Sequence, residues 1–303
     1  MLTGEKLLIT GATGMVALPV ALELAKDNEV WAAARFSDAK AKAQLEAAGV
    51  HTATVDLISG DLGTLPTDFA YLLNFSVVKT QKWGPDLDGN AGGLGALMNH
   101  CRDARAVLHC SSTAVYQPHG HHAFAEDDPL GDNHRVLEFL ATYSISKIAT
   151  EAMARFCARQ LQLPTTIARL NVPYGDHGGW PAFIFEMMKA GMAVPVHHDA
   201  PSIYNPIHHD DIVGSIPKLL EAASVPATVV NWAGDESSSI EDWCAYFTEL
   251  TGIEATLEPT EHALASVKID TTRFNELIGH TTVSWKDGLR RMMEAQYSEF
   301  VKP

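Results

Sequence analysis

Short apolar runs alternate with amphipathic segments along the first half of the chain. Lys6–Thr10 encloses a run typical of a strand buried on both faces of a parallel sheet, and Leu18–Lys26 has helical periodicity. The same alternation predicts strands at Glu29–Arg35, Val50–Val55, Tyr71–Ser76, Ala106–Ser111 and Thr165–Leu170, and helices at Ser37–Ala48 (capped by Ser37), Gly92–Arg102 and Ala141–Gln162. This order predicts an α/β fold with a doubly wound parallel sheet, which binds ligands at the carboxyl ends of its strands.

Beyond Asn171 the pattern is less regular, and the segment is rich in Pro, Gly, His and Trp. Helices are predicted near Trp180–Ala190, Asp211–Ala223, Ile240–Thr251 and Trp285–Glu299. We therefore expect residues 1–170 to form the sheet domain. Residues 171–303 are expected to form mainly a smaller C-terminal lobe, with some segments returning to the sheet.

A glycine-containing turn joins the first predicted strand to the first predicted helix. Gly11 allows the tight turn, Gly14 lets the backbone approach a pyrophosphate, and the small Ala17 lets helix and strand pack closely. The helix N-terminus offers N–H groups and a partial positive charge to phosphates. A purely structural turn is the alternative. The pattern predicts a dinucleotide site contacted by Gly11, Thr13, Gly14, Met15 and Val16.

Composition narrows the function classes. The chain has 303 residues, 46% hydrophobic and 19% charged, which is ordinary for a globular protein. A net charge of −15 argues against a broad nucleic-acid or anionic-membrane surface. No apolar run is long enough to span a bilayer, and the first residues lack a signal-peptide pattern. The four cysteines lack paired spacing, so we expect free thiols and a cytoplasmic protein.

Tyr143 and Lys147 are four residues apart in a predicted helix, so their side chains share one face. A phenol has a pKa near 10 and is a poor acid or base at neutral pH. A neighbouring ammonium stabilises the phenolate and lowers that pKa. The pair is therefore a candidate acid–base group, although such spacing is also common by chance.

Together these motifs resemble those of the extended short-chain dehydrogenases/reductases, which include NAD-dependent epimerases and dehydratases. The resemblance covers nearly the whole chain and rests on Thr10–Ala17, Val55–Leu57, Leu72–Ser76, Asn90, His109–Tyr116, Tyr143, Lys147 and Ile207–Val213. It implies a Rossmann-type domain followed by a substrate-binding lobe. It also implies cofactor contacts from Asp56, Leu57, Asn74, Phe75, Ser76, Tyr143, Lys147 and Pro173.

The same resemblance assigns catalytic roles. Ser112 matches the hydroxyl that hydrogen-bonds the substrate oxygen, with Ser111 and Thr113 as neighbouring alternatives. Tyr143 would exchange a proton with that oxygen. Lys147 would lower the Tyr143 pKa and bind the nicotinamide ribose. Asn90 matches an asparagine that supports the lysine through water.

The end of the second predicted strand bears on the choice of cofactor. An NAD site usually has an acidic residue there to bind the ribose hydroxyls. Ala34 holds that position, and Arg35 follows, with a guanidinium suited to a 2′-phosphate. Ser37 could add a hydroxyl donor. A surface arginine is the alternative interpretation, and we expect NADP in preference to NAD.

Two departures from the family pattern favour a small, less charged substrate. Val172 replaces an asparagine that lies near the diphosphate in nucleotide-sugar enzymes, and Tyr204 replaces a diphosphate-binding arginine. We therefore expect an NADP(H)-dependent oxidoreductase that interconverts a ketone or aldehyde and an alcohol. A nucleotide-sugar epimerase or dehydratase with tightly bound NAD is the alternative. A non-catalytic dinucleotide sensor is a third, disfavoured because such relatives tend to lose the Tyr or the Lys.

Several residues near these motifs are candidate substrate contacts, although each also suits a protein core: Val77, Val78, Trp83, Tyr116, Gln117, Trp180, Phe183 and Tyr204. The histidine-rich segment His119–His122 could in principle hold a metal, but it has no supporting cysteine, and we expect none. The expected partner is a small-molecule substrate. The family resemblance also implies that a homodimer would form through the helices at Gly92–Arg102 and Ala141–Gln162.

Overall fold

The computed structural model describes residues 2–302. Contacts divide the chain into two units. We call the first the sheet unit; it comprises Met1–Ser112, Thr142–Arg169 and Val213–Val230. The second unit comprises Thr113–Ala141, Leu170–Ile212 and Asn231–Pro303. This grouping differs from a single division after residue 170, because the segment after β5 leaves the sheet unit and the helix at 213–221 returns to it.

The sheet unit contains the predicted doubly wound parallel sheet. Its seven strands lie in the order β13-β7-β5-β4-β1-β2-β3. Their bounds are β1 Lys6–Thr10, β2 Glu29–Ala34, β3 His51–Thr54, β4 Tyr71–Asn74, β5 Ala106–Ser112, β7 Thr165–Leu170 and β13 Thr228–Trp232. β1 pairs in parallel with both β2 and β4, so the strand order reverses between them. This reversal puts a topological switch point at the carboxyl end of β1, where such sheets bind ligands.

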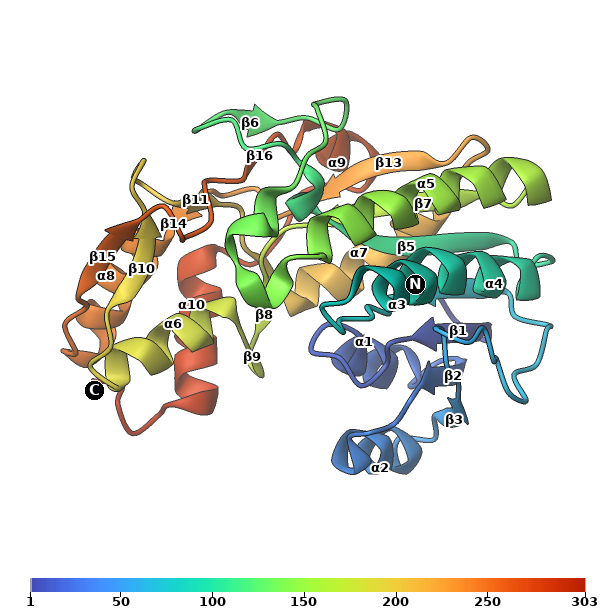
Figure 1. Cartoon of the computed structure of the whole chain (residues 1–303). Coiled ribbons are helices and arrows are strands. Elements are labelled where there is room, and N and C mark those ends of the chain that lie inside the picture. The colour runs from blue at the N-terminus through green and yellow to red at the C-terminus, as the bar shows by residue number, and fades with distance from the viewer. Residues whose placement is uncertain (1, 303) are drawn as a thin grey trace. The chain divides into compact units, whose positions relative to one another are not determined.

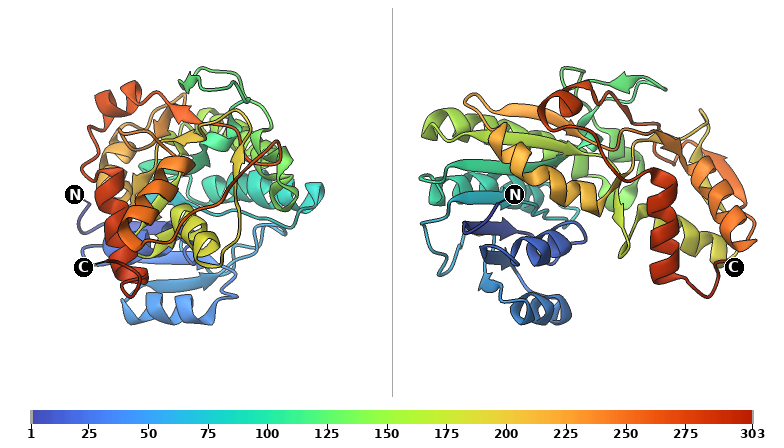
Figure 2. Two further views of the ribbon diagram at one scale, coloured as in Figure 1. Left: turned by 90° about the vertical axis from the view of Figure 1, so that its left-hand side faces the viewer. Right: turned by 180° about the vertical axis from the view of Figure 1, so that it is seen from behind.

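Helices cover both faces of this sheet. They are α1 Ala17–Leu24, α2 Ala39–Ala47, α3 Trp83–Leu87, α4 Gly93–His100, α5 Tyr143–Leu161 and α7 His209–Glu221, with a π-helical turn at Asp88–Gly92 before α4. α4 and α5 lie on one face (Figure 1). The view from behind shows α1 and α7 on the other (Figure 2). Both faces of the strands are therefore buried, as their continuous apolar runs predict.

The face under α4 and α5 has an apolar core. Leu8 of β1 and Val107 of β5 belong to one buried cluster with Leu97 of α4 and Ala154 of α5. All four side chains are fully buried. This packing fixes the height of α5 above β5, and these two elements carry Tyr143, Lys147 and Ser112.

The start of α2 differs from the sequence prediction. Asp38, not Ser37, is the N-cap, and its carboxylate accepts hydrogen bonds from the backbone N–H groups of Lys40 and Ala41. A carboxylate there satisfies two donors and also interacts favourably with the helix dipole. Ser37 and Arg35 are left exposed in the connection between β2 and α2.

The second unit is built from short strands and helices around buried aromatic residues. Its strands are β6 Ala123–Phe124, β8 Pro173–Gly175, β9 Gly178–Gly179, β10 Val194–His197, β11 Ile203–Tyr204, β12 Ile207–His208, β14 Ser238–Ser239, β15 Leu257–Thr260 and β16 Lys268–Ile269. Its helices are α6 Trp180–Lys189, α8 Ile240–Thr251, α9 Thr272–Leu277 and α10 Trp285–Gln296, with short 3-10 turns at Thr113–Val115, Asn133–Val136 and Glu138–Leu140. Trp232 and Trp243 are fully buried. Within the described residues, no helix is long and apolar enough to cross a membrane.

Candidate active site

The glycine turn between β1 and α1 has the geometry of a phosphate cradle. Gly11 has a φ of +68°, and a Cβ there would lie 2.8 Å from the Cα and N of Ser76. Glycine therefore allows both the backbone conformation and the close approach of the segment after β4. No side chain caps the first turn of α1, and Gly14 and Met15 are exposed. Uncapped helical N–H groups beside an exposed glycine turn suit a pyrophosphate.

The ends of β2 and β3 carry the residues expected near the adenosine. Arg35 is exposed and forms no ion pair with any residue that the structure describes. Asp56 is exposed and accepts a hydrogen bond from the backbone N–H of Ile58. Leu57 is buried; a Cβ on Gly93 would lie 2.8 Å from the Leu57 Cβ. The structure thus leaves the Arg35 and Asp56 side chains accessible and makes Leu57 part of the core.

A row of polar side chains crosses β1, β4 and β5 near their carboxyl ends. Asn74 Oδ1 accepts hydrogen bonds from the hydroxyls of Thr10 at 2.6 Å and Ser76 at 2.7 Å. Its amide nitrogen must therefore donate to His109 Nδ1, 3.0 Å away. Burial and the charge of Lys147 lower the pKa of His109 to about 3, so the ring is neutral and can accept this bond. Asn74, an expected cofactor contact, thus uses its side chain to join the strands.

The proton-transfer candidates lie together in the sheet unit. Tyr143 is the first residue of α5, and its side chain is hydrogen-bonded to Ser112 at the end of β5. Lys147 Nζ lies 6.0 Å from the Tyr143 ring centroid and donates a 2.8 Å hydrogen bond to the carbonyl oxygen of Cys110. The Lys147 side chain is buried. The three predicted residues therefore share one site.

The two neighbours of Ser112 have other partners. Ser111 Oγ donates a 2.7 Å hydrogen bond to Glu151 in α5. In the second unit, the Thr113 hydroxyl donates to the Leu170 carbonyl oxygen and accepts a hydrogen bond from the Asn171 amide. Alternation along β5 sends Ser111 away from Ser112, and the 3-10 turn that begins at Thr113 ends the strand. Ser112 is thus the hydroxyl of the three that contacts Tyr143.

The electrostatics at Tyr143 differ from the expected role of Lys147. Burial raises the pKa of Tyr143 above its usual value. The hydrogen bond from Ser112 and the charge of Lys79 act in the opposite direction, and Lys147 is not among the main contributors. Burial also lowers the pKa of Lys147. The sequence pattern identified the pair but not Lys79, which lies in a loop with no regular periodicity.

Asn90 forms direct hydrogen bonds to the segment after β4. It lies in the π-helical turn, where its Oδ1 accepts from the Val78 N–H and its Nδ2 donates to the Val78 carbonyl oxygen, both at 2.8 Å. Nδ2 also donates to the Asp86 carbonyl oxygen at 2.7 Å. The amide is therefore occupied in holding the segment after β4. These direct bonds link Asn90 to the backbone of Val78 in the segment after β4 and to the backbone of Asp86 in α3.

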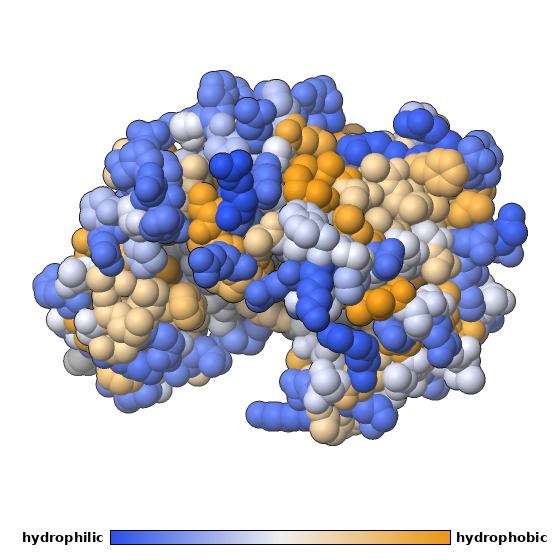
Figure 3. Space-filling model, in the orientation of Figure 1, coloured by the Kyte–Doolittle hydropathy of each residue, from blue (hydrophilic) through white to orange (hydrophobic). Residues whose placement is uncertain are grey.

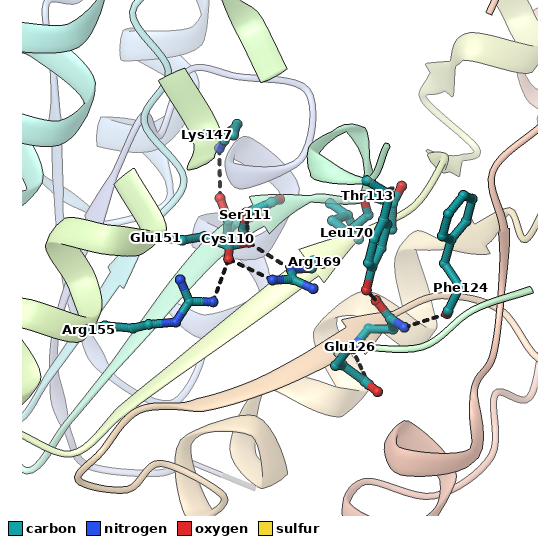
Figure 4. Close-up of polar contacts among 12 residues, drawn as sticks. Cys110, Ser111, Thr113, Phe124, Glu126, Lys147, Glu151, Arg155, Arg169 and Leu170 are labelled. Carbon is teal, nitrogen blue, oxygen red and sulfur yellow. Dashed lines mark hydrogen bonds and ion pairs between the residues drawn. The ribbon is translucent and has the colours of Figure 1, made fainter. Parts of the chain in front are cut away.

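A buried ion pair joins α5 to β7. Glu151 accepts bonds from Arg169 Nε and Nη2 of β7, each at 2.9 Å, and from Arg155 at 2.8 Å (Figure 4). The Glu151 and Arg169 side chains are 0% and 2% exposed. Burial alone raises the pKa of Glu151, but the hydrogen bonds and charge of Arg169, with Ser111 and Arg155, lower it below its usual value. Glu151 therefore joins α5, β5 and β7.

Other candidates in the sheet unit and the second unit divide into surface and core residues. Trp83 is 49% exposed at the start of α3, Phe183 is 62% exposed on α6, and Gln117 is exposed. Tyr116 is fully buried and donates to Asn231 Oδ1 at 2.6 Å. Tyr204 is buried and donates to carbonyl oxygens of Leu264 and Ala265. The structure thus buries the side chains of Tyr116 and Tyr204 and hydrogen-bonds both hydroxyls.

Three further residues of the candidate set can be placed. Trp180 begins α6 and packs edge-on against Tyr204, with 4.9 Å between ring centroids. Pro173 begins β8 and is partly buried, as is Val78 in the segment after β4. Among the described residues, no group of three His, Cys, Asp or Glu side chains could hold a metal ion. His122 is instead paired with Asp128 at 2.8 Å.

Comparisons with known proteins support the sequence resemblance. The model of the NAD dependent epimerase/dehydratase family matches residues 7–233, most of the chain. A UDP-glucuronic acid 4-epimerase from Bacillus cereus, solved with UDP-glucuronic acid and NAD, has a TM-score of 0.81 and 19% identity over 96% of this chain and 98% of its own. No curated protein matches the sequence.

Two other solved structures are similar over their full length. A UDP-N-acetylglucosamine 4-epimerase from Methanobrevibacter ruminantium has a TM-score of 0.83 and 14% identity, over 98% of this chain and 100% of its own. A dTDP-glucose 4,6-dehydratase from Streptomyces venezuelae, solved with NAD, has a TM-score of 0.80 and 18% identity, over 97% of both chains. At these identities the likeness shows the fold.

The Glu151 ion pair generates a stability prediction. Glu151→Ala leaves two arginines facing a buried site without their carboxylate, and we expect the free energy of unfolding to fall by about 3–5 kcal/mol. Glu23→Ala, which removes the exposed partner of Lys26, should change it little. Urea denaturation with circular dichroism measures both. Equal losses in the two variants would contradict the assignment.

The same carboxylate should make stability depend on pH. Because the folded pKa of Glu151 is lowered, its contribution is present above the pKa of an unfolded glutamate, about 4.3, and is lost as pH falls through the folded value. The stability difference between the protein and Glu151→Gln should therefore be constant from neutral pH to about pH 5 and shrink below about pH 4.

Proposed function

Because the chain belongs to the NAD dependent epimerase/dehydratase family, we propose that it is a dinucleotide-dependent redox enzyme acting on a nucleotide-linked sugar. The observation that carries the proposal is the hydrogen bond between Ser112 and Tyr143, with Lys147 beside them, in the same unit as the glycine turn. The similar solved structures include a UDP-glucuronic acid 4-epimerase with UDP-glucuronic acid and NAD. This favours 4-epimerisation with NAD as the specific reaction.

The residues of the sheet unit fit a nicotinamide dinucleotide. The Gly11 turn packs so closely on Ser76 that a Cβ would fill the space, and the first turn of α1 is uncapped. When bound, the nicotinamide would supply a hydride acceptor and donor. Tyr143 would take the proton of a sugar hydroxyl during oxidation and return it during reduction. Ser112 would hold the reacting oxygen beside Tyr143, and Lys147, bonded to the Cys110 carbonyl, would fix the wall of the site.

The buried carboxylates favour epimerisation over dehydration. Loss of water from a sugar needs a further acid to protonate the leaving hydroxyl group. Asp86 and Glu151 are the buried carboxylates described in the sheet unit. Burial raises the pKa of each, but hydrogen-bond donors lower both below their usual values, from Thr142 and Thr80 at Asp86 and from Arg169 at Glu151. Both are therefore ionised and already hydrogen-bonded, which suits structural carboxylates.

Net carbonyl reduction with NADPH is a second candidate. The specific observation in its favour is Arg35, which is exposed at the end of β2 beside Ala34 and could bind a 2′-phosphate. Tyr204 supports it as well. The Tyr204 side chain replaces a diphosphate-binding arginine of the family pattern and is buried and bonded to backbone carbonyls.

Bound nucleotide and product distinguish the two candidates. We expect purified protein to carry NAD, identified by mass spectrometry after denaturation. We also expect it to interconvert C4 epimers of a UDP-sugar without added cofactor, followed by NMR. Stoichiometric NADPH oxidation with simple ketones or aldehydes, and no epimer, would support the reductase instead. The proposed function would be contradicted if the protein neither epimerised a UDP-sugar nor oxidised NADPH with a ketone or aldehyde.

Tyr143→Phe tests the acid–base assignment. Removing the phenolic hydroxyl should lower turnover by about 10²–10⁴-fold, because proton transfer loses its catalyst. Nucleotide content and the circular dichroism spectrum should stay unchanged. Tyr71→Phe, at the start of β4, is the matched control and should keep full activity. Full turnover in Tyr143→Phe would exclude Tyr143 as the proton carrier.

We also propose a homodimer that uses the outer face of α5. Ala152, Phe156, Arg159 and Gln160 are exposed there and line a shallow hollow together with Arg155. Figure 3 shows apolar side chains gathered over α5. Phe156 is 58% exposed, and burying such a ring against a second copy would remove a large apolar surface from water.

Phe156→Asp should therefore shift the protein from dimer to monomer, because a carboxylate opposes burial of this face. Size-exclusion chromatography with light scattering gives the mass directly. Phe183→Asp, a substitution at an equally exposed phenylalanine on α6, should leave the mass unchanged. A wild-type protein that is monomeric at micromolar concentration would refute the dimer.

A further inference from the structure

A second ammonium group lies beside Tyr143. Lys79 Nζ is 5.4 Å from the centroid of the Tyr143 ring, compared with 6.0 Å for Lys147 Nζ. The two lysines have different surroundings. Lys147 is buried and bonded to the Cys110 carbonyl oxygen, whereas Lys79 is exposed in the segment that follows β4. Tyr143 therefore lies near one buried and one exposed cation.

The backbone on both sides of Lys79 is held by side chains. Before it, Asn90 bonds both the N–H and the carbonyl oxygen of Val78 at 2.8 Å. After it, Asp86 Oδ1 accepts from the N–H and the hydroxyl of Thr80, at 2.6 and 2.7 Å. Asn90 and Asp86 are themselves buried. The side chain of an exposed lysine usually samples many rotamers. The backbone of Lys79, however, is held on one side by Asn90 and on the other by Asp86.

The same aspartate also holds the start of the catalytic helix. Asp86 Oδ2 accepts a 2.6 Å hydrogen bond from the hydroxyl of Thr142, the residue before Tyr143. One carboxylate thus ties the segment that carries Lys79 to the helix end that carries Tyr143. The proximity of Lys79 to Tyr143 is therefore set by the backbone of the sheet unit as well as by the rotamer of the lysine side chain.

The groups that face Tyr143 come from four elements. α5 contributes Lys147, β5 contributes Ser112 and the Cys110 thiol, and the segment after β4 contributes Lys79. From α3, the Asp86 carboxylate bonds the hydroxyl of Thr142, the residue before Tyr143. Burial raises the pKa of Tyr143 and the Cys110 thiol adds to this, while Ser112 and Lys79 counteract it. A neighbouring cation favours the phenolate form of a tyrosine, and the Lys79 ammonium lies 5.4 Å from the centroid of the Tyr143 ring.

We propose that Lys79 is a second cation of the proton-transfer site, whose ammonium stabilises the phenolate form of Tyr143. This inference rests on the proposed function only in taking Tyr143 as the acid–base group. The Lys79 side chain is exposed to solvent, so its ammonium stays hydrated. Its effect should therefore be screened by salt, unlike that of a buried charge.

The test measures the ionisation of Tyr143 directly. Replacing Tyr143 with 3,5-difluorotyrosine brings the phenol into an accessible pH range, and its titration is followed by fluorine NMR without substrate. In this background Lys79→Met should raise the titration midpoint by about one pH unit, and Lys79→Arg should restore it. Lys82→Met, which removes an exposed lysine three residues away, should leave the midpoint unchanged. Added salt should reduce the difference in titration midpoint between the parent protein and Lys79→Met.

Equal midpoints in the parent and Lys79→Met proteins, each with an unchanged circular dichroism spectrum, would overturn the proposal. A shift of the same size in Lys82→Met would overturn it too, because the effect would then be one of general surface charge. Lys79→Gln serves as the second neutral variant if Lys79→Met does not fold. Because no turnover is measured, a shifted midpoint in a protein without epimerase activity would support Lys79 and reject only the proposed function.

Discussion

The site depends on one buried carboxylate. Glu151 accepts hydrogen bonds from Ser111 of β5, from Arg169 of β7 and from Arg155 on its own helix. A buried ion pair of this kind contributes little net stability compared with apolar packing, but breaking it is costly, because a charge is left buried without its partner. The main effect of the ion pair is on geometry. It holds α5 in one register against the strand that ends at Ser112, so Tyr143 and Ser112 meet at hydrogen-bond distance.

Asp86 holds the N-terminal end of the same helix, α5, through its hydrogen bond from Thr142. The Asp86 carboxylate accepts hydrogen bonds from Thr80, Gln81 and Thr142, which lie on two segments far apart in the sequence. The two carboxylates differ in their surroundings. Glu151 is bonded to two arginines in the core, whereas Asp86 is bonded to a surface segment through backbone and hydroxyl donors. Both carboxylates hold their segments in place, as a preorganised site requires.

The sequence predicted the parts of the site that depend on local pattern. The glycine turn, the Tyr143–Lys147 spacing and Ser112 are each contained in a few consecutive residues, and the family resemblance fixed their order. Ser111 and Thr113 could not be separated from Ser112 in sequence, because the distinction depends on their partners Glu151 and Asn171. The direct contacts of Asn90 could not be predicted from the sequence for the same reason. Its amide bonds Val78, and the conformation of that loop has no periodic signal.

In the mechanism that we propose, Lys147 and Lys79 divide a task that sequence reasoning gave to Lys147 alone. Burial lowers the pKa of Lys147 and its ammonium is bonded to the Cys110 carbonyl oxygen, so this lysine orders the end of β5. Burial also raises the pKa of Tyr143, so less of the phenolate, the form that accepts a proton, is present near neutral pH. A second cation is then needed where it costs no desolvation, at the solvent edge of the ring. Lys79 occupies that position because Asn90 and Asp86 fix the backbone on either side of it.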